Sequence, residues 1–208
     1  MFQLAYDFFT APIRMVLFPD HIAERFHITS LRAERLAVVL PELRGRCLDI
    51  GAGDNTLVRL YTQMSEKLGI ARGLAVGSVG VDIVDWGGGC QIIKSSEQLP
   101  FPDASFDTVS FIACLNHIPE RAAALVEARR VLRPGGRIVI TMIGRFTGKL
   151  GHAIWWYSED KHREVDEHEE MGLNQREVLA LLAQAGFKMP FIKRFVYRLN
   201  YLYIAQRD

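Results

Sequence analysis

The stretch of sequence that decides the fold is Cys47–Asn55, "CLDIGAGDN". Its first part, Cys47–Ile50, is typical of a buried strand, and Gly51 and Gly53 follow in a predicted turn. Because glycine has no Cβ, these two positions let the chain turn sharply into a helix and let a ligand approach the backbone. The pattern is typical of nucleotide-binding α/β folds and predicts a ligand site at the carboxyl end of this strand.

The carboxylate of Asp49, two residues before Gly51, narrows the class of ligand. A carboxylate at a strand end would repel a pyrophosphate, whereas it suits a cofactor that carries an ammonium group. The dinucleotide fingerprint requires a third glycine where this chain has Thr56, and the turn lacks the G-K-[ST] signature of a phosphate loop. We therefore expect a cationic ligand rather than a dinucleotide.

Hydrophobic periodicity predicts that strands and helices alternate along the chain. The expected strands are Cys47–Ile50, Val79–Val84, Gln91–Lys94, Phe106–Ile112 and Arg137–Ile143, with two more inside Phe191–Arg207 that turn near Arg198–Asn200. The expected helices run from Thr29 or Ser30 to Pro41, from Asn55 to Gly69, from Pro119 to Leu132 and from Asn174 to Gly186. The last helix is expected to start with a capping box formed by Asn174 and Glu177. This order predicts an α/β fold with a doubly wound, Rossmann-like, mostly parallel sheet that a hairpin closes with an antiparallel strand.

Length and composition predict one domain. The chain has 208 residues, of which 49% are hydrophobic, and this suffices for one α/β core. We expect residues 1–208 to form a single domain with a helical cap or lid (1–44), a cofactor-binding core (45–143) and a substrate lid (144–173). The net charge is +1 and charges of both signs are mixed, so we expect no nucleic acid partner.

The three cysteines, Cys47, Cys90 and Cys114, lie far apart in the sequence. An odd, unclustered set favours reduced thiols in a cytoplasmic protein and argues against a disulfide framework or a zinc site. No apolar run reaches the length of a membrane span, so we expect no stable membrane insertion.

A second carboxylate follows in "GVDIVDW", residues 80–86. Asp82 falls where the second strand should end, and a carboxylate there can accept hydrogen bonds from both hydroxyls of a ribose. Asp85 is the competing candidate. Residues 69–78, "GIARGLAVGS", are expected to be extra loop, which would explain the long spacing between the glycines and this carboxylate.

Four motifs, in this order and spacing, resemble those of class I S-adenosylmethionine (SAM) dependent methyltransferases: "LDIGAGDN", "GVDI", "SEQLPFPDASFDTV" and "VLRPGGRIVI". They are most similar to the branch that includes the ubiquinone and menaquinone biosynthesis methyltransferases, and the match covers about residues 45–143. The resemblance implies a seven-stranded sheet whose last strand is antiparallel, with SAM as cofactor and S-adenosylhomocysteine as product.

The resemblance also implies which residues bind the cofactor: Asp49, Gly51, Ala52, Gly53, Asp82, Ile83, Ser96, Glu97, and Ala113 or Cys114. The glycine turn would hold the methionine end of SAM, with Asp49 reaching its ammonium group directly or through water. Asp82 would hold the ribose hydroxyls, and Ile83 would pack on the adenine. The backbone of the third motif would meet the adenine edge, and the end of the fourth strand would line the sulfonium.

Two positions depart from the family pattern. Asn55 stands where the family often has a third glycine; we expect it to adopt a left-handed backbone and to cap the following helix. Ser95 stands where the family often has an aspartate for the adenine amino group, and Glu97 is a possible substitute.

The chemistry of methyl transfer asks little of the protein beyond holding the nucleophile near the methyl group and excluding water. An oxygen or nitrogen nucleophile can also need a general base. His117, in "CLNHIPE" after the fourth strand, is the candidate catalytic residue. The alternative is that His117 begins a helix and only shapes the pocket.

The stretch "HAIWWYSEDKHREVDEHEE", residues 152–170, allows three interpretations. It can be a substrate lid, a solvated charged helix whose tryptophans pack on the domain, or a metal site; we expect no metal. The lid would bind the acceptor through Trp155, Trp156, Tyr157, His162 and Arg163, and the metal site would use His162, Asp166 and His168.

The aromatic N-terminal segment, residues 2–18, can be a lid over the cofactor, a helix packed on the sheet or an interfacial membrane anchor. Its polar side has almost no lysine or arginine apart from Arg14, which favours the first two over the anchor.

We therefore expect a cytoplasmic SAM-dependent methyltransferase, a monomer or homodimer, that acts on a small-molecule acceptor. The D/N-P-P-Y/F motif common in methyltransferases of nucleic acid and protein amides does not occur in "ACLNHIPE", which disfavours those substrates. The alternatives are a non-catalytic SAM-binding or scaffold protein of the same fold and an NAD-dependent oxidoreductase. The oxidoreductase explains neither Asp49 nor "LPFPDASFD".

Overall fold

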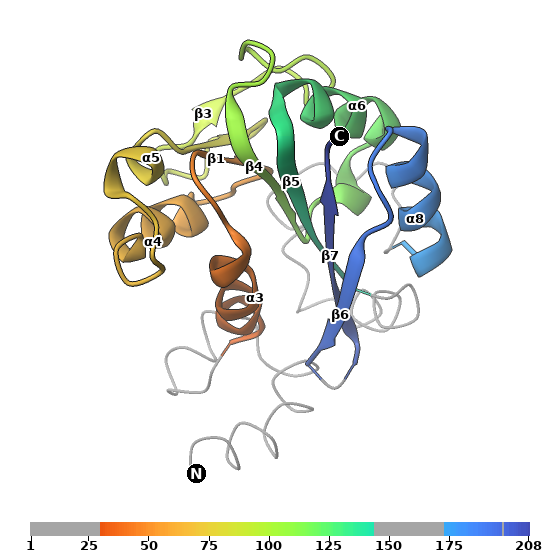
Figure 1. Ribbon diagram of the computed structural model, residues 1–208, viewed down its shortest axis with the longest axis horizontal. Helices are drawn as coiled ribbons and strands as arrows, with labels where there is room; N and C mark the ends of the chain where they lie inside the picture. The colour runs from red at the N-terminus through yellow and green to blue at the C-terminus, as the bar shows by residue number, and fades with distance from the viewer. Residues whose placement is uncertain (1–29, 144–172, 197) are drawn as a thin grey trace, which may run out of the picture.

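The computed structural model describes residues 30–143, 173–196 and 198–208, and a seven-stranded sheet runs through them in the order β3-β2-β1-β4-β5-β7-β6 (Figure 1). The strands are β1 (Cys47–Ile50), β2 (Val79–Asp82), β3 (Gln91–Ile92), β4 (Phe106–Ile112), β5 (Leu132–Ile143), β6 (Phe191–Phe195) and β7 (Asn200–Gln206). In this sheet β7 runs antiparallel to the other strands, which are parallel to one another. The predicted doubly wound α/β fold with an antiparallel last strand is confirmed.

Helices cover both faces of the sheet (Figure 1). They are α3 (Leu31–Val39), α4 (Thr56–Met64), α5 (Arg72–Val76), α6 (Arg121–Val131) and α8 (Gln175–Gln184), with short 3-10 helices η1 (Leu40–Glu42) and η2 (Leu115–His117). Successive residues of a strand point to opposite faces. Accordingly Ile138 and Ile140 of β5 join one hydrophobic cluster, whereas Val139 between them joins the other.

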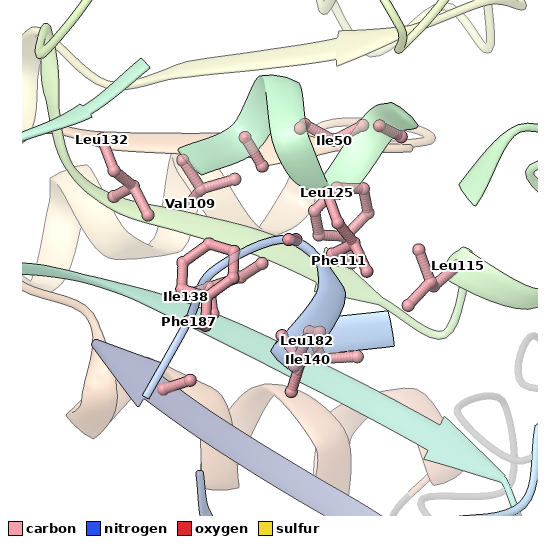
Figure 2. Close-up of a cluster of buried hydrophobic side chains, with 14 of the residues drawn as sticks. Ile50, Val109, Phe111, Leu115, Leu125, Leu132, Ile138, Ile140, Leu182 and Phe187 are labelled. Atoms are coloured by element: carbon pink, nitrogen blue, oxygen red, sulfur yellow. The ribbon is translucent and has the colours of Figure 1, made fainter. Parts of the chain in front are cut away.

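The larger cluster lies between the sheet and helices α6 and α8 (Figure 2). Val109 and Phe111 of β4 pack there with Leu125 of α6 and Leu182 of α8, and all four side chains are buried. The second cluster packs α3, α4 and α5 against the other face, with Tyr61 and Leu202 among its members. This close packing fixes the positions of the strand ends that carry the site.

Two helix starts follow the predicted signals. The Ser30 hydroxyl accepts a hydrogen bond from the Ala33 amide and caps α3. At α8, Asn174 and Glu177 form the predicted capping box, with hydrogen bonds of 3.0 and 2.7 Å. The expected start at Pro119 was wrong, because α6 begins at Arg121. Ile118, which precedes the proline, is extended, as the proline ring requires.

Other boundaries also differ from the prediction, and strands β2 and β3 each end two residues earlier than expected. Residues 69–78 were expected to be loop, but α5 forms within them, and α4 ends at Met64 instead of Gly69. Strand β5 begins at Leu132, so it includes the "RPGG" segment that precedes the predicted strand. The Gly135 amide donates to the Arg207 carbonyl and the Arg207 amide to the Gly136 carbonyl, so the end of the chain supplies this segment with sheet-like partners.

The segments expected to act as lids, residues 1–29 and 144–172, lie outside the described residues. Their proposed roles, and the single-domain division of the chain, therefore stay predictions.

Candidate cofactor and active site

The site is built where the order of the sheet reverses. After β1 the chain adds β2 and then β3 on one side, and returns to place β4 and β5 on the other. The carboxyl ends of β1, β2 and β4 therefore meet at one edge, which is where open α/β sheets bind ligands. Figure 1 shows β1 beside β4, with which it pairs.

The glycine turn after β1 is tied to the neighbouring strand. The amides of Gly51 and Ala52 both donate to the Val81 carbonyl of β2, at 2.9 and 3.0 Å. Gly51 and Gly53 have φ angles of 72° and 55°, in the left-handed region. These angles confirm the predicted need for glycine at this turn, because residues other than glycine adopt them only at a cost in energy.

Cys114 packs directly on Gly51. A Cβ on Gly51 would lie 2.7 Å from the Cys114 Cβ and 2.8 Å from its sulfur, so the side chain occupies the space that this glycine leaves. The Cys114 thiol donates to the Ile50 carbonyl at 3.0 Å, and burial raises its pKa well above the ordinary value. Cys114 is thus a neutral thiol at the strand ends, suited to line a pocket rather than to act as a nucleophile.

Asp82 joins the turn to the end of β2. One carboxylate oxygen accepts from the Gly53 amide at 2.9 Å, and the other accepts from the Val84 amide at 3.0 Å. Each oxygen keeps a second lone pair for a ligand hydroxyl. The competing candidate, Asp85, is exposed and accepts from the Gly87 amide in a local turn. Asp82 is therefore the carboxylate that lies against the glycine turn.

Asp49 lies in the central strand β1 and is buried, with 2% of its surface exposed. The Ser110 hydroxyl of β4 donates to its Oδ1 at 2.7 Å. Burial raises the pKa of Asp49 to about 7, the Ser110 hydrogen bond opposes this shift, and the charge of Asp82 adds to it. A cation bound at the strand ends would favour the ionised form of this carboxyl group. Sequence reasoning missed Ser110, because only the pairing of β1 with β4 reveals it.

Asn55 has the left-handed backbone that was predicted, with φ at 60°, but its predicted role as a side-chain cap was wrong. The cap of α4 comes from Asp54, whose Oδ1 accepts from the Thr56 amide at 3.2 Å. The Asn55 side chain turns toward β2 instead, where a Cβ on Gly80 would lie 2.2 Å from its Oδ1. Asp54 also pairs with Arg32 of α3, which ties that helix to the turn.

The side of the site expected to hold adenine is apolar and open. Ile83 is 65% exposed just after β2, and Trp86, which sequence reasoning did not select, is exposed in the same loop. Ser96 is buried and Glu97 is exposed. Ser95 accepts a hydrogen bond from the Glu97 amide at 3.0 Å in a local turn, and its hydroxyl keeps its proton and a second lone pair for a ligand.

His117 ends η2, directly after β4. Its amide donates to the Cys114 carbonyl at 2.9 Å, which places the histidine beside the strand end that carries Cys114. The side-chain nitrogen of Asn116 lies 3.1 Å from Nε2 and 3.4 Å from Nδ1 of the ring. Asn116 therefore contacts the imidazole, and a role for His117 as a base stays a prediction.

The residues predicted to bind the acceptor lie outside the described residues: Trp156, Tyr157, His162 and Arg163. The same holds for the alternative metal site. Among residues 30–143, 173–196 and 198–208, no group of three or more His, Cys, Asp or Glu side chains could hold a metal ion.

Comparison with known proteins agrees with this geometry. Residues 48–140, from β1 to the middle of β5, match the family model described as a methyltransferase domain. Residues 48–140, somewhat less than half of the chain, are therefore similar to methyltransferase domains. The cofactor expected for this methyltransferase domain is therefore SAM.

Two curated relatives share part of the methyltransferase domain. The ubiquinone/menaquinone biosynthesis C-methyltransferase UbiE of Bordetella avium is 41% identical over 66 residues, which cover 32% of this chain and 26% of that protein. The 27-O-demethylrifamycin SV methyltransferase of Amycolatopsis mediterranei is 32% identical over 136 residues, which cover 58% of this chain and 47% of that protein. The chain thus spans between about a quarter and a half of these two relatives.

The solved structure of a SAM-dependent methyltransferase from Aquifex aeolicus has the same fold as the methyltransferase domain. The TM-score is 0.60 at 16% identity, and the alignment covers 92% of this chain and 100% of that chain. Among the described helices, none is long and apolar enough to cross a membrane.

Proposed function

We propose that this protein transfers the methyl group of SAM to a small-molecule acceptor. The glycine turn, together with Asp49 and Asp82, would hold the cofactor. The observation that carries the proposal is the hydrogen bond from the Gly53 amide to Asp82 Oδ2, which joins the glycine turn to the carboxylate after β2 at 2.9 Å. This hydrogen bond holds two features together at the carboxyl ends of the strands: a backbone turn that a ligand can approach closely, and a carboxylate that can accept from hydroxyl groups.

The residues present fit the parts of SAM. Buried Asp49, with its raised pKa, suits an ammonium group, which would stabilise the ionised carboxylate. Half-buried Asp82 offers lone pairs to the ribose, and exposed Ile83 offers an apolar surface to the adenine. Ser95 contributes less than an aspartate would, since a neutral hydroxyl is a weaker acceptor than a carboxylate.

When bound, SAM supplies a methyl group on a sulfonium that is already electrophilic. The protein then has to position the acceptor and exclude water. Cys114 presents a neutral thiol beside Gly51, which adds no competing nucleophile. His117, half-buried after β4, would accept a proton from a hydroxyl or amine acceptor.

The small-molecule acceptor is supported by two features. The curated relatives are named for methyl transfer in quinone biosynthesis and to a rifamycin. The segment after β4, "ACLNHIPE", lacks the D/N-P-P-Y/F motif of enzymes that methylate nucleic acid or protein amides. All three cysteines are free, which agrees with the proposed cytoplasmic location.

Calorimetry with S-adenosylhomocysteine tests the cofactor site. Asp82→Ala should weaken binding by roughly 10- to 100-fold, because hydrogen bonds to a charged group contribute about 1.5–3 kcal/mol. Asp85→Ala is the matched control, since Asp85 lies in the same loop but bonds only locally. Equal losses in both variants, or tighter binding of NAD than of S-adenosylhomocysteine, would contradict the proposal.

Catalysis needs a separate experiment. Formation of S-adenosylhomocysteine from SAM should depend on an added acceptor from a panel of phenols, quinols and amines. If the protein binds SAM tightly but methylates no member of a broad panel, the alternative of a non-catalytic SAM-binding protein is favoured.

A further inference from the structure

The C-terminal hairpin has an unusual charge pattern. From Val178 to Arg207 the sequence contains no aspartate or glutamate. The same stretch contains five cationic residues, Lys188, Lys193, Arg194, Arg198 and Arg207. The rest of the chain carries 20 cationic and 24 acidic residues, so this C-terminal stretch is the basic part of the protein.

Three of these cations are exposed, although the Arg194 guanidinium also lies over the Tyr201 ring, 5.2 Å from its centroid. Strand β6 is at the edge of the sheet, and Lys193, Arg194 and Arg198 on it and on the following turn are exposed. None of the three takes part in an ion pair within the described residues. By contrast, Lys188 pairs with Asp208 at 2.7 Å, and Arg207 donates to backbone carbonyls in the last turn of α6.

Apolar side chains are exposed along the same edge. Met189 is 82% exposed, Phe191 is 62% exposed, and Leu199 in the turn is 37% exposed. Phe191 and Lys193 point to the same face of β6, because side chains alternate along a strand. Cationic and apolar groups are therefore interleaved on one edge; we call residues 188–196, 198 and 199 of this edge the basic rim.

The chemistry of the rim selects among partners. A second copy of the chain would pair edge to edge, but cations on an edge strand oppose such pairing, since they would face their own counterparts. A nucleic acid would use the cations and could stack a base on Phe191, but it would leave Met189 exposed. The surface of an anionic bilayer uses both kinds of side chain, cations at the headgroups and apolar groups below them.

We propose that the basic rim binds the surface of membranes that contain anionic lipids. The contact is peripheral and involves no membrane-spanning segment. Asn200, which follows the rim, pairs with Ile143 at the carboxyl end of β5. The rim therefore ends at the same edge of the sheet as the candidate active site, and docking would hold that edge near the lipid (Figure 1).

Cosedimentation with vesicles tests this directly on the full chain. The protein should sediment with vesicles of phosphatidylcholine mixed with phosphatidylserine, and much less with phosphatidylcholine alone, and high salt should release it. Lys193→Glu should lower the partition coefficient by about fivefold or more, from the contribution of one cation near an anionic surface. Phe191→Ser should lower it as well.

Matched controls separate the rim from general charge and folding. Lys67→Glu reverses another exposed lysine, away from the rim, and Val126→Ser removes an exposed apolar side chain on α6. Both should bind vesicles as the wild type does, and all variants should keep the thermal unfolding midpoint and S-adenosylhomocysteine affinity. The proposal is overturned if the wild type ignores anionic vesicles, if Lys67→Glu loses as much as Lys193→Glu, or if polynucleotide competes the protein off the vesicles through the same residues. None of these outcomes depends on methyl transfer.

Discussion

The Ser110 hydroxyl donates to Asp49 Oδ1 at 2.7 Å, across the junction of β1 and β4, and both side chains are buried. This pair places a carboxyl group inside the central part of the sheet, two residues before the glycine turn. The hydrogen bond offsets only part of the cost of burial, so the pKa of Asp49 rises to about 7. A group that titrates near neutral pH at the centre of the candidate site leads to two predictions.

Asp49→Asn should stabilise the protein at pH 8 and have little effect on stability near pH 4. The folded state holds the Asp49 proton up to about pH 7, whereas an unfolded aspartate loses it near pH 4. The free energy of unfolding of the wild type should therefore fall by up to about 4 kcal/mol as pH rises from about 4 to about 7. Above about pH 7 it should stay level. Urea unfolding at a series of pH values measures this. Asp85→Asn, an exposed control, should keep the wild-type pH dependence.

Binding of S-adenosylhomocysteine should release a proton below pH 7. The ammonium group of the ligand would favour ionised Asp49, so affinity should rise up to about tenfold per pH unit and level off above pH 7. Calorimetry in buffers of different ionisation enthalpy counts the proton. In Asp49→Asn the pH dependence should disappear; if it persists there, another group is responsible.

Gly51→Ala should destabilise the protein more than Gly53→Ala. Both glycines have left-handed backbones, which costs alanine about 1–2 kcal/mol. A Cβ at Gly51 also meets Cys114, whereas a Cβ at Gly53 meets nothing within 4 Å. The contact should add about 1–3 kcal/mol to the first variant, measured by urea unfolding. Equal losses would show that Cys114 moves aside without cost.

Gly80→Ala should be destabilising and should be partly rescued by Asn55→Gly. A Cβ at Gly80 lies 2.2 Å from Asn55 Oδ1 and 2.8 Å from the Ala52 Cβ, and the second change removes the first contact. Glycine accepts the left-handed backbone of Asn55. A double-mutant cycle should give a favourable coupling of about 0.5–3 kcal/mol. Additive losses would mean that Ala52 alone blocks the new methyl group.

The parts of the fold that sequence predicted well depend on local signals. The run "FDTVSFI" has the strand bounds of β4, and the capping box at Asn174 marks the start of α8. The glycine turn also follows from local chemistry, since left-handed backbones need residues such as glycine and asparagine.

The parts that sequence missed depend on partners far away in the chain. The "RPGG" segment extends β5 because Arg207, about seventy residues later, hydrogen-bonds to it. Ser110 became a partner of Asp49 only through the pairing of β1 with β4. Asp54, not Asn55, caps α4, because the Asn55 side chain finds space over Gly80.

The measurement that tests the central claim most directly is a crystal structure of the complex with S-adenosylhomocysteine. The ligand should lie at the carboxyl ends of β1, β2 and β4, with its ribose hydroxyls about 3 Å from the Asp82 carboxylate and its ammonium group joined to Asp49 directly or through one water. A ribose held by Asp85 instead, or a ligand bound away from Gly51 and Gly53, would contradict the account.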